Sequence, residues 1–402
     1  RLLKRLRALG QIGALPDGGV CRLALSDDDR AGRDQLVQWM EELGLAVSID
    51  AIGNIWGIRP GTEDSPPVMI GSHIDTVATG GLYDGALGVM AGLEVAAALN
   101  DVDARTARPL AVAAFTNEEG ARFAPDMMGS GVHQGTLDLS EMLAVRGIDG
   151  ATLGEELARI GYSGAVQPKT LTPAAFLELH IEQGPVLERD GVRIGAVTGV
   201  QGISWTQFTI SGQSNHAGTT PMDLRRDAGL VAARIAVEAR AIASDFGPPQ
   251  VATVGSVAFE PGLVNVVPER AAITVDLRNT DDDRLKAAEA RLHASARVFA
   301  EEEGCKIATR SLARFAPVAF DEAIVARVEA AAMARQLSVR RMPSGAGHDA
   351  QMFAPNCPTA MIFVPSKDGL SHNIAEHTEP EELIAGAEIL LDVALDLLGE
   401  AQ

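Results

Sequence analysis

The sequence predicts an α/β protein with a mixed, mostly parallel sheet, helices on both of its faces, and an inserted α+β domain. Two observations lead to this prediction. Short apolar strands with polar residues at their carboxyl ends alternate with helical segments, as in parallel sheets. From about residue 199 a half-exposed alternation replaces this pattern, which returns near Phe315. We therefore expect one domain from residues 1–198 and 315–402, with residues 199–314 inserted into it.

Composition limits the class of protein. The chain has 402 residues and is 46% hydrophobic, which is enough for two cores. Its formal net charge is −20, spread along the chain, so we expect neither nucleic acid nor an anionic membrane surface as a partner. No stretch approaches the roughly 20 apolar residues of a membrane helix. The cysteines, Cys21, Cys305 and Cys357, are widely spaced, which is typical of a reducing compartment and predicts a cytoplasmic protein.

The first domain begins with helices and a hairpin. Leu2, Leu3, Leu6 and Leu9 are expected to be the apolar positions of a first helix, and Ser26 is placed to cap a second one. A hairpin over residues 46–61 follows. Further along, the pattern predicts buried strands near 68–70, 108–120 and 174–184, and a helix from 85 to about 100.

The inserted domain is predicted as strand, helix, two strands and helix. The strands are expected near 203–212, 251–258 and 271–278. One helix should follow Pro221 and end near Ala243, and the other should span 283–303 with Asp282 or Asp283 as its cap.

After the insertion the sequence predicts a glycine-rich turn at 343–350, a strand at 361–365 and a final helix. The apolar face expected for that helix comprises Leu383, Ile384, Ala387, Leu390, Leu391, Ala394, Leu395 and Leu398.

Side chains that suit metal ions lie at the ends of the predicted strands. They are His73, Asp84, Glu118, Glu119, His180 and, near the C-terminus, His372. In open α/β sheets ligands bind at the carboxyl ends of the strands. Histidine with carboxylate and no thiolate is the ligand set of a hydrolytic Zn²⁺, Mn²⁺ or Co²⁺ site, and one aspartate can bridge two such ions. The pattern therefore favours a dinuclear metal hydrolase.

Two details refine this site. Asp75 lies two residues after His73 on an extended segment, so its carboxylate could accept the second N–H of that imidazole. Of the adjacent Glu118 and Glu119, only one can point at a metal, which leaves the other to act as a general base. Taken singly, a histidine at a strand end is more often structural and a Glu-Glu pair is usually solvated. Their concurrence at several strand ends favours the catalytic interpretation.

The motifs also closely resemble those of a known family. They are GSHIDTV (71–77), GGLYDGALGV (80–89), TNEEGARF (116–123), ELHIEQGPVLE (178–188), NHAGTTPM (215–222), GAGHDA (345–350) and VPSKDGLSHNIAEHT (364–378). In their residues and in their order along the chain, they resemble the motifs of the dinuclear metal amidohydrolases of the N-carbamoyl-L-amino acid hydrolase, β-ureidopropionase and allantoate amidohydrolase group. This group is a branch of the aminoacylase/carboxypeptidase clan. The resemblance implies a zinc-peptidase-like catalytic fold with a ferredoxin-like lid and dimerisation domain.

The resemblance also assigns the metal ligands. It implies two divalent metal ions per subunit, one of them held by His73, Asp84 and His180. Asp84, as a bridge, would hold the other together with Glu119 and His372.

The remaining roles implied by the resemblance concern catalysis and substrate binding. Glu118 would be the general base, and His216 would stabilise the oxyanion. The positions that resemble substrate-binding residues are Gln183, His216, Asn265, Arg278 and Gly347. Among them Arg278 corresponds to the arginine that binds the substrate carboxylate, a task that suits its two-pronged guanidinium.

The expected function is hydrolysis of the ureido C–N bond of N-carbamoyl-L-amino acids to the amino acid, CO₂ and ammonia. The partner would be a small molecule with a carboxylate and a ureido group, and the protein would be a homodimer. Allantoate amidohydrolase and β-ureidopropionase remain open, because the same site would serve all three substrates. Further alternatives are an N-acyl amino acid or dipeptide hydrolase, or a non-catalytic binding protein of the same fold.

Overall fold

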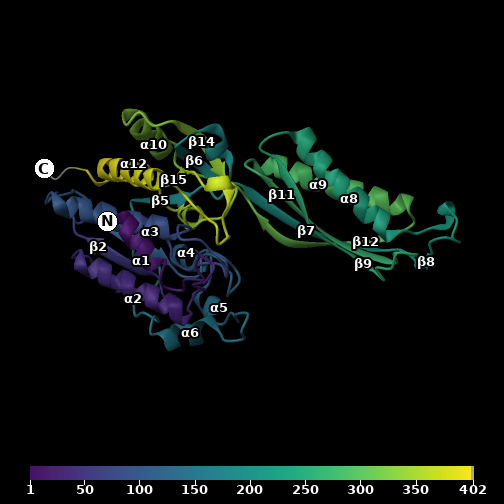
Figure 1. Cartoon of the computed structure of the whole chain (residues 1–402), viewed down its shortest axis with the longest axis horizontal. Helices are drawn as coiled ribbons and strands as arrows, with labels where there is room; N and C mark the ends of the chain where they lie inside the picture. Colours follow the sequence, from purple (N-terminus) through teal and green to yellow (C-terminus); the bar gives the residue numbers. More distant parts are fainter. Residues whose placement is uncertain (400–402) are drawn as a thin grey trace. The chain divides into compact units, whose positions relative to one another are not determined.

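The computed structural model describes residues 1–399 and divides into two compact units. The first unit comprises Arg1–Gly199 with Ala319–Gln402, and the second comprises Val200–Val318 (Figure 1). Each has its own sheet and its own helices. Within the described part of the chain, no helix is both long enough and apolar enough to span a bilayer.

The first unit is built on a mixed sheet with the strand order β1-β2-β4-β3-β5-β15-β6-β13, and β14 also pairs with β6. Its central strands β4, β3, β5 and β15 are parallel, and the flanking pairs β1–β2, β2–β4 and β15–β6 are antiparallel. The strands are β1 Ala46–Ile49, β2 Ile55–Arg59, β3 Val68–His73, β4 Leu110–Phe115, β5 Ala175–Ile181, β6 Ile194–Val200, β13 Val318–Ala319, β14 Val339–Ser344 and β15 Thr359–Val364. The predicted mixed, mostly parallel α/β architecture is confirmed.

Helices cover both faces of this sheet. Helices α3 and α12 pack together on one face, and α4 and α11 pack together on the other. The helices of the first unit are α1 Leu2–Leu9, α2 Asp27–Glu42, α3 Ala86–Asp101, α4 Met128–Gln134, α5 Leu139–Leu143, α6 Leu153–Ile160, α7 Val186–Asp190, α10 Glu322–Ala334, α11 Asp349–Phe353 and α12 Pro380–Leu398, with a 3₁₀ turn η2 at Lys367–Gly369.

Small residues bring α3 close to the sheet. A Cβ at Gly88 would lie 2.8 Å from the Leu179 carbonyl oxygen, and one at Gly92 would lie 2.8 Å from Val112 Cγ1. Glycine at both positions therefore permits a separation that a side chain would prevent. All six residues of β3 are buried beneath this helix. As a result the loop that precedes α3 lies over the carboxyl end of the strands.

Helix α2 is attached to the sheet by buried polar contacts. Ser26 caps it by accepting the Asp29 N–H, as the sequence predicts. Asp29 and Arg33 form a buried ion pair of 2.7 Å between Oδ2 and Nε. The Arg33 guanidinium also donates to the Gly53 carbonyl oxygen and to Thr116 Oγ1. These contacts join α2 to the end of β4.

The predicted apolar face of α12 is partly wrong. The buried residues of this helix are Leu383, Ala385, Gly386, Ile389, Leu390, Val393, Ala394 and Leu398. Ile384 and Leu395 are instead 43% and 42% exposed. The buried stripe is centred on Gly386, where a Cβ would lie 2.6 Å from Val364 Cγ1, so close packing selects small residues over larger apolar ones.

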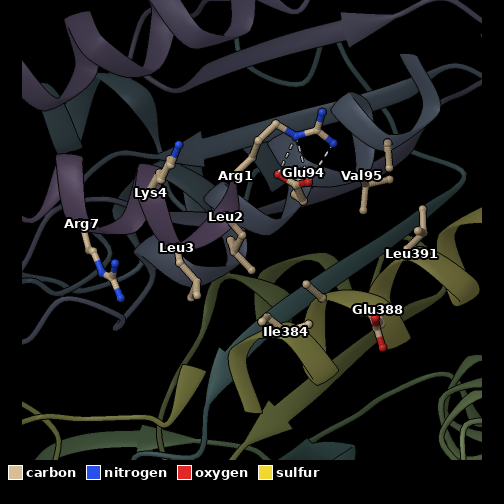
Figure 2. Close-up of a pocket in the computed structure, with 12 residues that line it drawn as sticks. Arg1, Leu2, Leu3, Lys4, Arg7, Glu94, Val95, Ile384, Glu388 and Leu391 are labelled. Carbon is tan, nitrogen blue, oxygen red and sulfur yellow. Dashed lines mark hydrogen bonds and ion pairs between the residues drawn. The ribbon is translucent and has the colours of Figure 1, made fainter. Parts of the chain in front are cut away.

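The exposed side of α12 borders a surface groove of about 510 Å³ (Figure 2). Ile384 and Leu391 of α12 lie along one side of it and Leu3 of α1 along the other. Arg1, at the start of α1, pairs across to Glu94 of α3 at 3.0 Å. The groove thus separates the first helix from the last.

The second unit has the βαββαβ topology of a ferredoxin-like fold. Its antiparallel sheet has the order β12-β7-β11-β9, and α8 and α9 pack on one face (Figure 1). Its elements are β7 Gly202–Ser211, β8 Asn215–His216, the 3₁₀ turn η1 Met222–Leu224, α8 Ala228–Phe246, β9 Val251–Glu260, β10 Val266–Val267, β11 Arg270–Asn279, α9 Asp282–Glu302 and β12 Lys306–Phe315. A separate apolar core with Phe208, Ile235, Ile273 and Leu292 lies between helices and sheet.

Two predicted helix starts in this unit are wrong. The first helix does not follow Pro221 directly, because residues 222–224 form a 3₁₀ turn and α8 begins only after its cap, Asp227. For α9 the cap is Asp281 rather than Asp282 or Asp283. Asp281 has extended dihedral angles and accepts the N–H groups two and three residues ahead, as an N-cap does, whereas its two neighbours lie in the first helical turn.

Candidate active site

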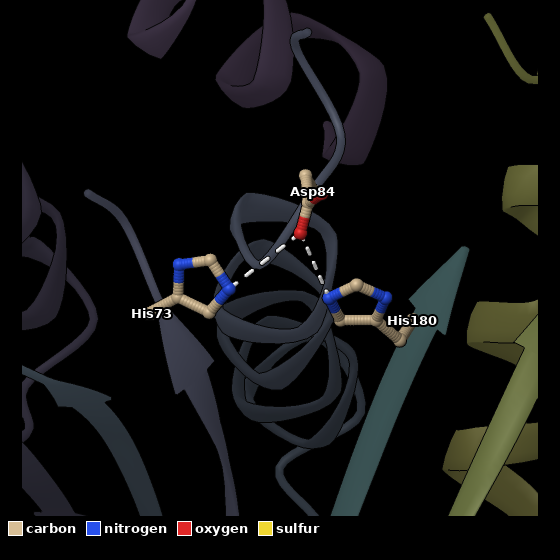
Figure 3. Close-up of side chains that lie close together, drawn as sticks. All are labelled: His73, Asp84 and His180. Carbon is tan, nitrogen blue, oxygen red and sulfur yellow. Dashed lines mark ion pairs between the residues drawn. The ribbon is translucent and has the colours of Figure 1, made fainter. Parts of the chain in front are cut away.

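The first group of side chains joins β3, β5 and the start of α3. His73 ends β3, His180 lies in β5, and Asp84 lies between them in the loop before α3 (Figure 3). Asp84 Oδ1 is 3.6 Å from His73 Nε2 and 3.2 Å from His180 Nε2. All three residues are buried. Their ligand atoms lie within 4.8 Å of one another, close enough to hold one metal ion.

Hydrogen bonds to backbone carbonyls orient the two imidazoles. His73 Nδ1 lies 3.0 Å from the Asp75 carbonyl oxygen, and His180 Nδ1 lies 2.8 Å from that of Ile181. Because a carbonyl can only accept, each Nδ1 carries its proton and each Nε2 faces Asp84. Fixing the ring through its second nitrogen is the usual way in which proteins prepare a histidine for metal ligation.

The Asp75 carboxylate has a different partner from the one expected. Its Oδ1 is 3.9 Å from His73 Nδ1, and the backbone carbonyl makes the hydrogen bond to the ring instead. The carboxylate accepts the backbone N–H groups of Glu118 and Glu119, each at 3.3 Å. Burial, opposed by the charge of His73, raises the pKa of Asp75 to about 6. Asp75 therefore links the His73 segment to the Glu118–Glu119 turn.

The second group consists of Asp84, Glu119 and His372. His372 Nε2 lies 3.1 Å from Glu119 Oε2 and 3.5 Å from Asp84 Oδ2. His372 is half-exposed and has a left-handed backbone with φ of 53°. Its hydrogen bond with Glu119 outweighs burial and raises its pKa to about 9. The two oxygens of Asp84 thus face two different sets of ligands, which is the geometry of a bridging carboxylate.

Glu118 lies beside the first group. Its Oε2 is 3.3 Å from His73 Nε2, and its side chain is buried. Burial raises its pKa well above the ordinary glutamate value, against the opposing charge of His73. The same contacts act on His73, whose pKa is raised because nearby carboxylates outweigh its burial. Burial thus makes the Glu118 carboxylate a stronger proton acceptor than an exposed glutamate, which suits a general base.

The donor set fits divalent metal ions. Imidazole nitrogens and carboxylate oxygens converge on Asp84 from both sides, and no thiolate is among them. Burial is the main cause of the raised pKa values of Glu118 and Asp75, and the neighbouring carboxylates add to it. A divalent cation would remove this electrostatic cost.

Gln183 and Gly347 also belong to the first unit. Gln183 follows β5, has a left-handed φ of 56°, and donates from Nε2 to Asp84 Oδ2 at 2.8 Å. Its Oε1 is buried and has no hydrogen-bond partner among residues 1–399. Gly347 lies in the turn between β14 and α11, where a Cβ would lie 3.0 Å from Met127 Cε. Gln183 therefore directly contacts the shared aspartate.

A third cluster adjoins His180. Glu178, His180 and His348 also lie within metal-binding distance of one another. However, Glu178 accepts Ser72 Oγ at 2.6 Å, and His348 Nε2 lies 2.9 Å from Ser344 Oγ. The His348 ring packs edge-on against His180, with 4.5 Å between centroids. These contacts indicate a hydrogen-bonded support for the His180 strand.

The other expected site residues lie in the second unit. His216 in β8 accepts the Gly218 N–H at Nδ1 over 3.0 Å, so the proton of a neutral ring is on Nε2. Asn265 is next to β10, and its carbonyl oxygen accepts the Ala217 N–H at 2.9 Å. His216 and Asn265 therefore lie on neighbouring segments of one small ladder. Arg278 in β11 pairs with Asp276 at 2.9 Å, which orients its guanidinium.

Comparison with known proteins identifies the family. Residues 69–396 match peptidase family M20/M25/M40. The chain belongs to this family. It is 42% identical to an N-carbamoyl-L-amino-acid amidohydrolase of Rhizobium meliloti over 98% of this chain and 95% of that protein. It is 37% identical to the allantoate amidohydrolase of Escherichia coli over 95% of this chain and 94% of that protein.

A solved structure shows the same fold over the whole chain. It is an amidase of the hydantoinase/carbamoylase family from Burkholderia multivorans, with a TM-score of 0.97 and 45% identity, and the match covers 100% of this chain and 98% of that one. The suspected relationship to the carbamoylase and allantoate amidohydrolase group is thereby confirmed. The family is metal-dependent, and the two groups that share Asp84 are places where this M20/M25/M40 member can hold a metal.

Sequence reasoning missed two residues of this family member's site, Ser371 and Glu376. Ser371 Oγ donates to Asp84 Oδ2 at 2.8 Å, and Glu376 accepts the Asp84 backbone N–H at 3.2 Å. Both lie close to His372 in the stretch 364–378, of which only the histidine was interpreted. A carboxylate four residues after the candidate ligand His372 was the available signal.

Proposed function

We propose that this chain hydrolyses the ureido C–N bond of N-carbamoyl-L-amino acids to give the amino acid, CO₂ and ammonia. The observation that carries the proposal is the pair of ligand groups that share Asp84, with the buried Glu118 beside them. The relative from Rhizobium meliloti, which bears the corresponding name, supports the choice of substrate class.

The proposed cofactors are two divalent metal ions per subunit, Zn²⁺, Mn²⁺ or Co²⁺. His73, Asp84 and His180 would hold one, and Asp84, Glu119 and His372 the other. When bound, the ions would supply Lewis acidity at the scissile carbonyl group and lower the pKa of the attacking water. The ligand types do not discriminate between these three ions, because imidazole and carboxylate accept all of them.

Glu118 is proposed as the general base and acid. Its buried carboxylate would take a proton from the attacking water and deliver that proton to the leaving nitrogen. Burial raises the pKa of Glu118, which strengthens its carboxylate as the acceptor of that proton. Asp75, through the N–H groups of Glu118 and Glu119, would hold the carboxylate in place.

Substrate-binding roles are proposed for residues of each unit, considered separately. Arg278, oriented by Asp276, offers a guanidinium suited to the substrate carboxylate, with Asn265 as a second polar contact. His216, with its proton on Nε2, is suited to donate to the oxyanion. In the first unit, the Oε1 of Gln183, which has no hydrogen-bond partner within residues 1–399, can accept a hydrogen bond from the ureido group. Gly347 would line the binding site beside it.

We also propose a homodimer in which the second unit contributes the interface. Its edge strand β9 and the loop that follows expose large apolar side chains, among them Val257, Phe259, Leu263 and Val264. Edge strands and apolar patches of this kind are commonly covered by another chain. Sedimentation analysis tests this proposal, and a monomer at micromolar concentration would contradict it.

The three free cysteines support a reducing, cytoplasmic location.

Allantoate is the second candidate substrate, because the Escherichia coli relative is an allantoate amidohydrolase. N-carbamoyl-β-alanine, the β-ureidopropionase substrate, carries the same ureido and carboxylate groups. An N-acyl amino acid or dipeptide hydrolase and a non-catalytic binding protein are less well supported. A binding protein would have no need of Glu118 beside two complete ligand groups.

The decisive experiment measures ammonia release by the metal-loaded protein from N-carbamoyl-L-methionine, N-carbamoyl-β-alanine and allantoate. The Glu118→Gln variant is expected to bind metal normally but to lose activity by about 10²–10⁴-fold, the usual contribution of a general base. Glu41→Gln, on the exposed face of α2, is the matched control. A fully active Glu118→Gln protein would remove Glu118 from the mechanism, and inactivity on all three substrates would favour an N-acyl substrate.

A further inference from the structure

Glu376 connects two loops that are distant in sequence. It lies after β15 and is 5% exposed. Its Oε1 accepts the backbone N–H groups of Tyr83 at 3.0 Å and Asp84 at 3.2 Å, across 292 residues of sequence in the second case. Glu376 belongs to neither ligand group. A buried carboxylate with two backbone donors is thus committed to the segment that carries the shared aspartate.

The surrounding backbone is shaped to receive this side chain. A Cβ at Gly81 would lie 2.1 Å from Glu376 Oε1, so only glycine leaves room for the carboxylate there. On the other side, Ser371 Oγ lies 3.4 Å from Glu376 Oε2 and 2.8 Å from Asp84 Oδ2. Both the main chain and the carboxylate of Asp84 are therefore linked to the loop that contains Ser371 and Glu376.

The two ligand groups depend on this link to different degrees. His73 and His180 belong to strands β3 and β5, which the sheet holds in place. His372 lies on the loop itself, between Ser371 and Glu376, and its side chain is 51% exposed. The loop is closed by a short turn in which Glu376 N–H donates to the Asn373 carbonyl oxygen at 3.0 Å. Its attachment near Asp84 thus determines where the His372 imidazole lies.

We propose that Glu376 is a positioning residue that sets Asp84 and His372 at the separation needed for the second metal ion. By accepting the Tyr83 and Asp84 N–H groups, it fixes the His372 loop against the Asp84 loop. Loss of this acceptor weakens binding at Asp84, Glu119 and His372 more than at the strand-borne group. The inference rests on the proposed two-metal function and assigns to it a residue that does not touch the metals.

The proposed role of Glu376 depends on its ability to accept hydrogen bonds. Its effect can therefore be distinguished by experiment from an effect of its negative charge. A glutamine at this position keeps an oxygen that can accept both N–H groups, whereas an alanine keeps none. Glu376→Gln should therefore behave as the unchanged protein does, and Glu376→Ala should not. Glu381→Ala is the matched control, because Glu381 is an exposed glutamate in the first turn of α12.

The test is a titration of the full-length, metal-stripped protein with Co²⁺, in which calorimetry and visible absorption measure the binding. The unchanged chain, Glu376→Gln and Glu381→Ala should bind two ions. Glu376→Ala should bind one ion at concentrations that fill both sites of the unchanged chain, with at least a tenfold weaker second site. Of these variants, Glu376→Ala alone should show faster amide exchange of Tyr83 and Asp84 in the metal-free protein than Glu376→Gln, Glu381→Ala and the unchanged chain.

A second variant acts without removing the glutamate. Gly81→Ala places a methyl group where the carboxylate lies, so it should produce the same selective loss. Circular dichroism of each metal-free variant establishes whether it is folded. If Glu376→Ala is not folded, the metal titration of Gly81→Ala tests the proposal instead.

The outcomes distinguish the two proposals. If the unchanged chain binds a single ion, both the proposed two-metal function and this inference are overturned. If the unchanged chain binds two ions and Glu376→Ala also binds two with affinities within twofold, only the positioning role is overturned. Equal loss in Glu376→Gln and Glu376→Ala would likewise overturn it in favour of a charge effect.

Discussion

Asp84 is the residue on which both ligand groups depend, and its position is set by the residue that follows it. Gly85 has a φ of 64°, and a Cβ there would lie 2.4 Å from atoms of the His73 ring. A larger residue would therefore have both a strained backbone and a clash with a ligand. The conformation of Gly85 is what allows the chain to turn from Asp84 directly into α3.

Gly85→Ala is expected to abolish metal binding at His73, Asp84 and His180. The left-handed backbone adds about 1–3 kcal/mol of instability, and displacement of the His73 ring disrupts the ligand geometry. Metal content after dialysis and the thermal midpoint measure the two effects. Gly44→Ala is the matched control, since Gly44 has a similar φ of 74° and, apart from its chain neighbours, no other residue among 1–399 comes within 4 Å of its Cβ position. Full metal content in Gly85→Ala would contradict this explanation.

Protonation of His372 predicts the pH dependence of metal binding. Its pKa of about 9 lies above the ordinary value of 6.5, so the imidazolium–Glu119 pair stabilises the metal-free protein fully below about pH 6.5, and this stabilisation is lost as the pH rises to about 9. A metal needs the neutral ring, so binding must release this proton at pH 7. Affinity for the second ion should fall by up to about tenfold per pH unit between pH 9 and 7. Calorimetry in buffers of different ionisation enthalpy counts the protons, and a count of zero at pH 7 would refute the assignment.

At the level of elements, α2 supports the end of β4 through a buried charge. The Asp29 and Arg33 side chains are 0% and 3% exposed, and Arg33 reaches Thr116, two residues before Glu118. Replacing one partner leaves the other charge buried without compensation.

Arg33→Met is expected to lower the free energy of unfolding by about 3–5 kcal/mol, the usual cost of breaking a buried pair. Arg30→Met in the same helix provides the comparison, because Arg30 and Asp34 are largely exposed and 3.8 Å apart. That substitution should change stability by less than about 1 kcal/mol. Urea unfolding measures both, and equal values for the two variants would show that burial of the pair is unimportant.

Strands were predictable from the sequence where burial is complete. Every residue of β3, β4, β5 and β15 is buried, so their apolar runs stand out from the flanking loops. Edge strands β9 and β12 are both mostly exposed, but only β9 keeps a nearly charge-free, valine-rich sequence, whereas lysine and arginine interrupt β12, which was missed. The face of α12 was misassigned because hydropathy ranks Ile384 above Gly386, whereas close packing selects the glycine.

The same contrast applies to the site. The candidate ligands could be named because they follow recognisable strands and because their motifs resemble a known family. The partner of the Asp75 carboxylate could not be predicted. The Asp75 backbone carbonyl competes with this carboxylate for the His73 N–H, and only the local geometry decides between them. Glu376 was also hidden, because its partners are main-chain N–H groups that every sequence possesses.

At the level of the whole molecule, two cores predict two unfolding events. The proposed metal ligands all lie in the first unit, whereas the second unit has a core of its own. Ligand binding stabilises only the structure that contains the site, by about 2.7 kcal/mol at a free concentration of 100 times Kd. Removal of the metal with a chelator should therefore lower the midpoint temperature of one calorimetric transition and leave that of the other unchanged. A single transition that shifts as a whole would show that the two units unfold together.

The chain leaves and re-enters the first unit at adjacent positions. Thr198 precedes the 119 residues of the second unit, Val200 to Val318, and Phe320 follows them. The Phe320 N–H donates to the Thr198 carbonyl oxygen at 3.0 Å. Because the two ends already lie side by side, a short turn could replace the insertion with little entropic cost of loop closure. The second unit is thus a cassette that recombination could exchange between relatives while the sheet and its ligands are retained. Specificity in such a lineage can change by replacement of a module as well as by point substitution.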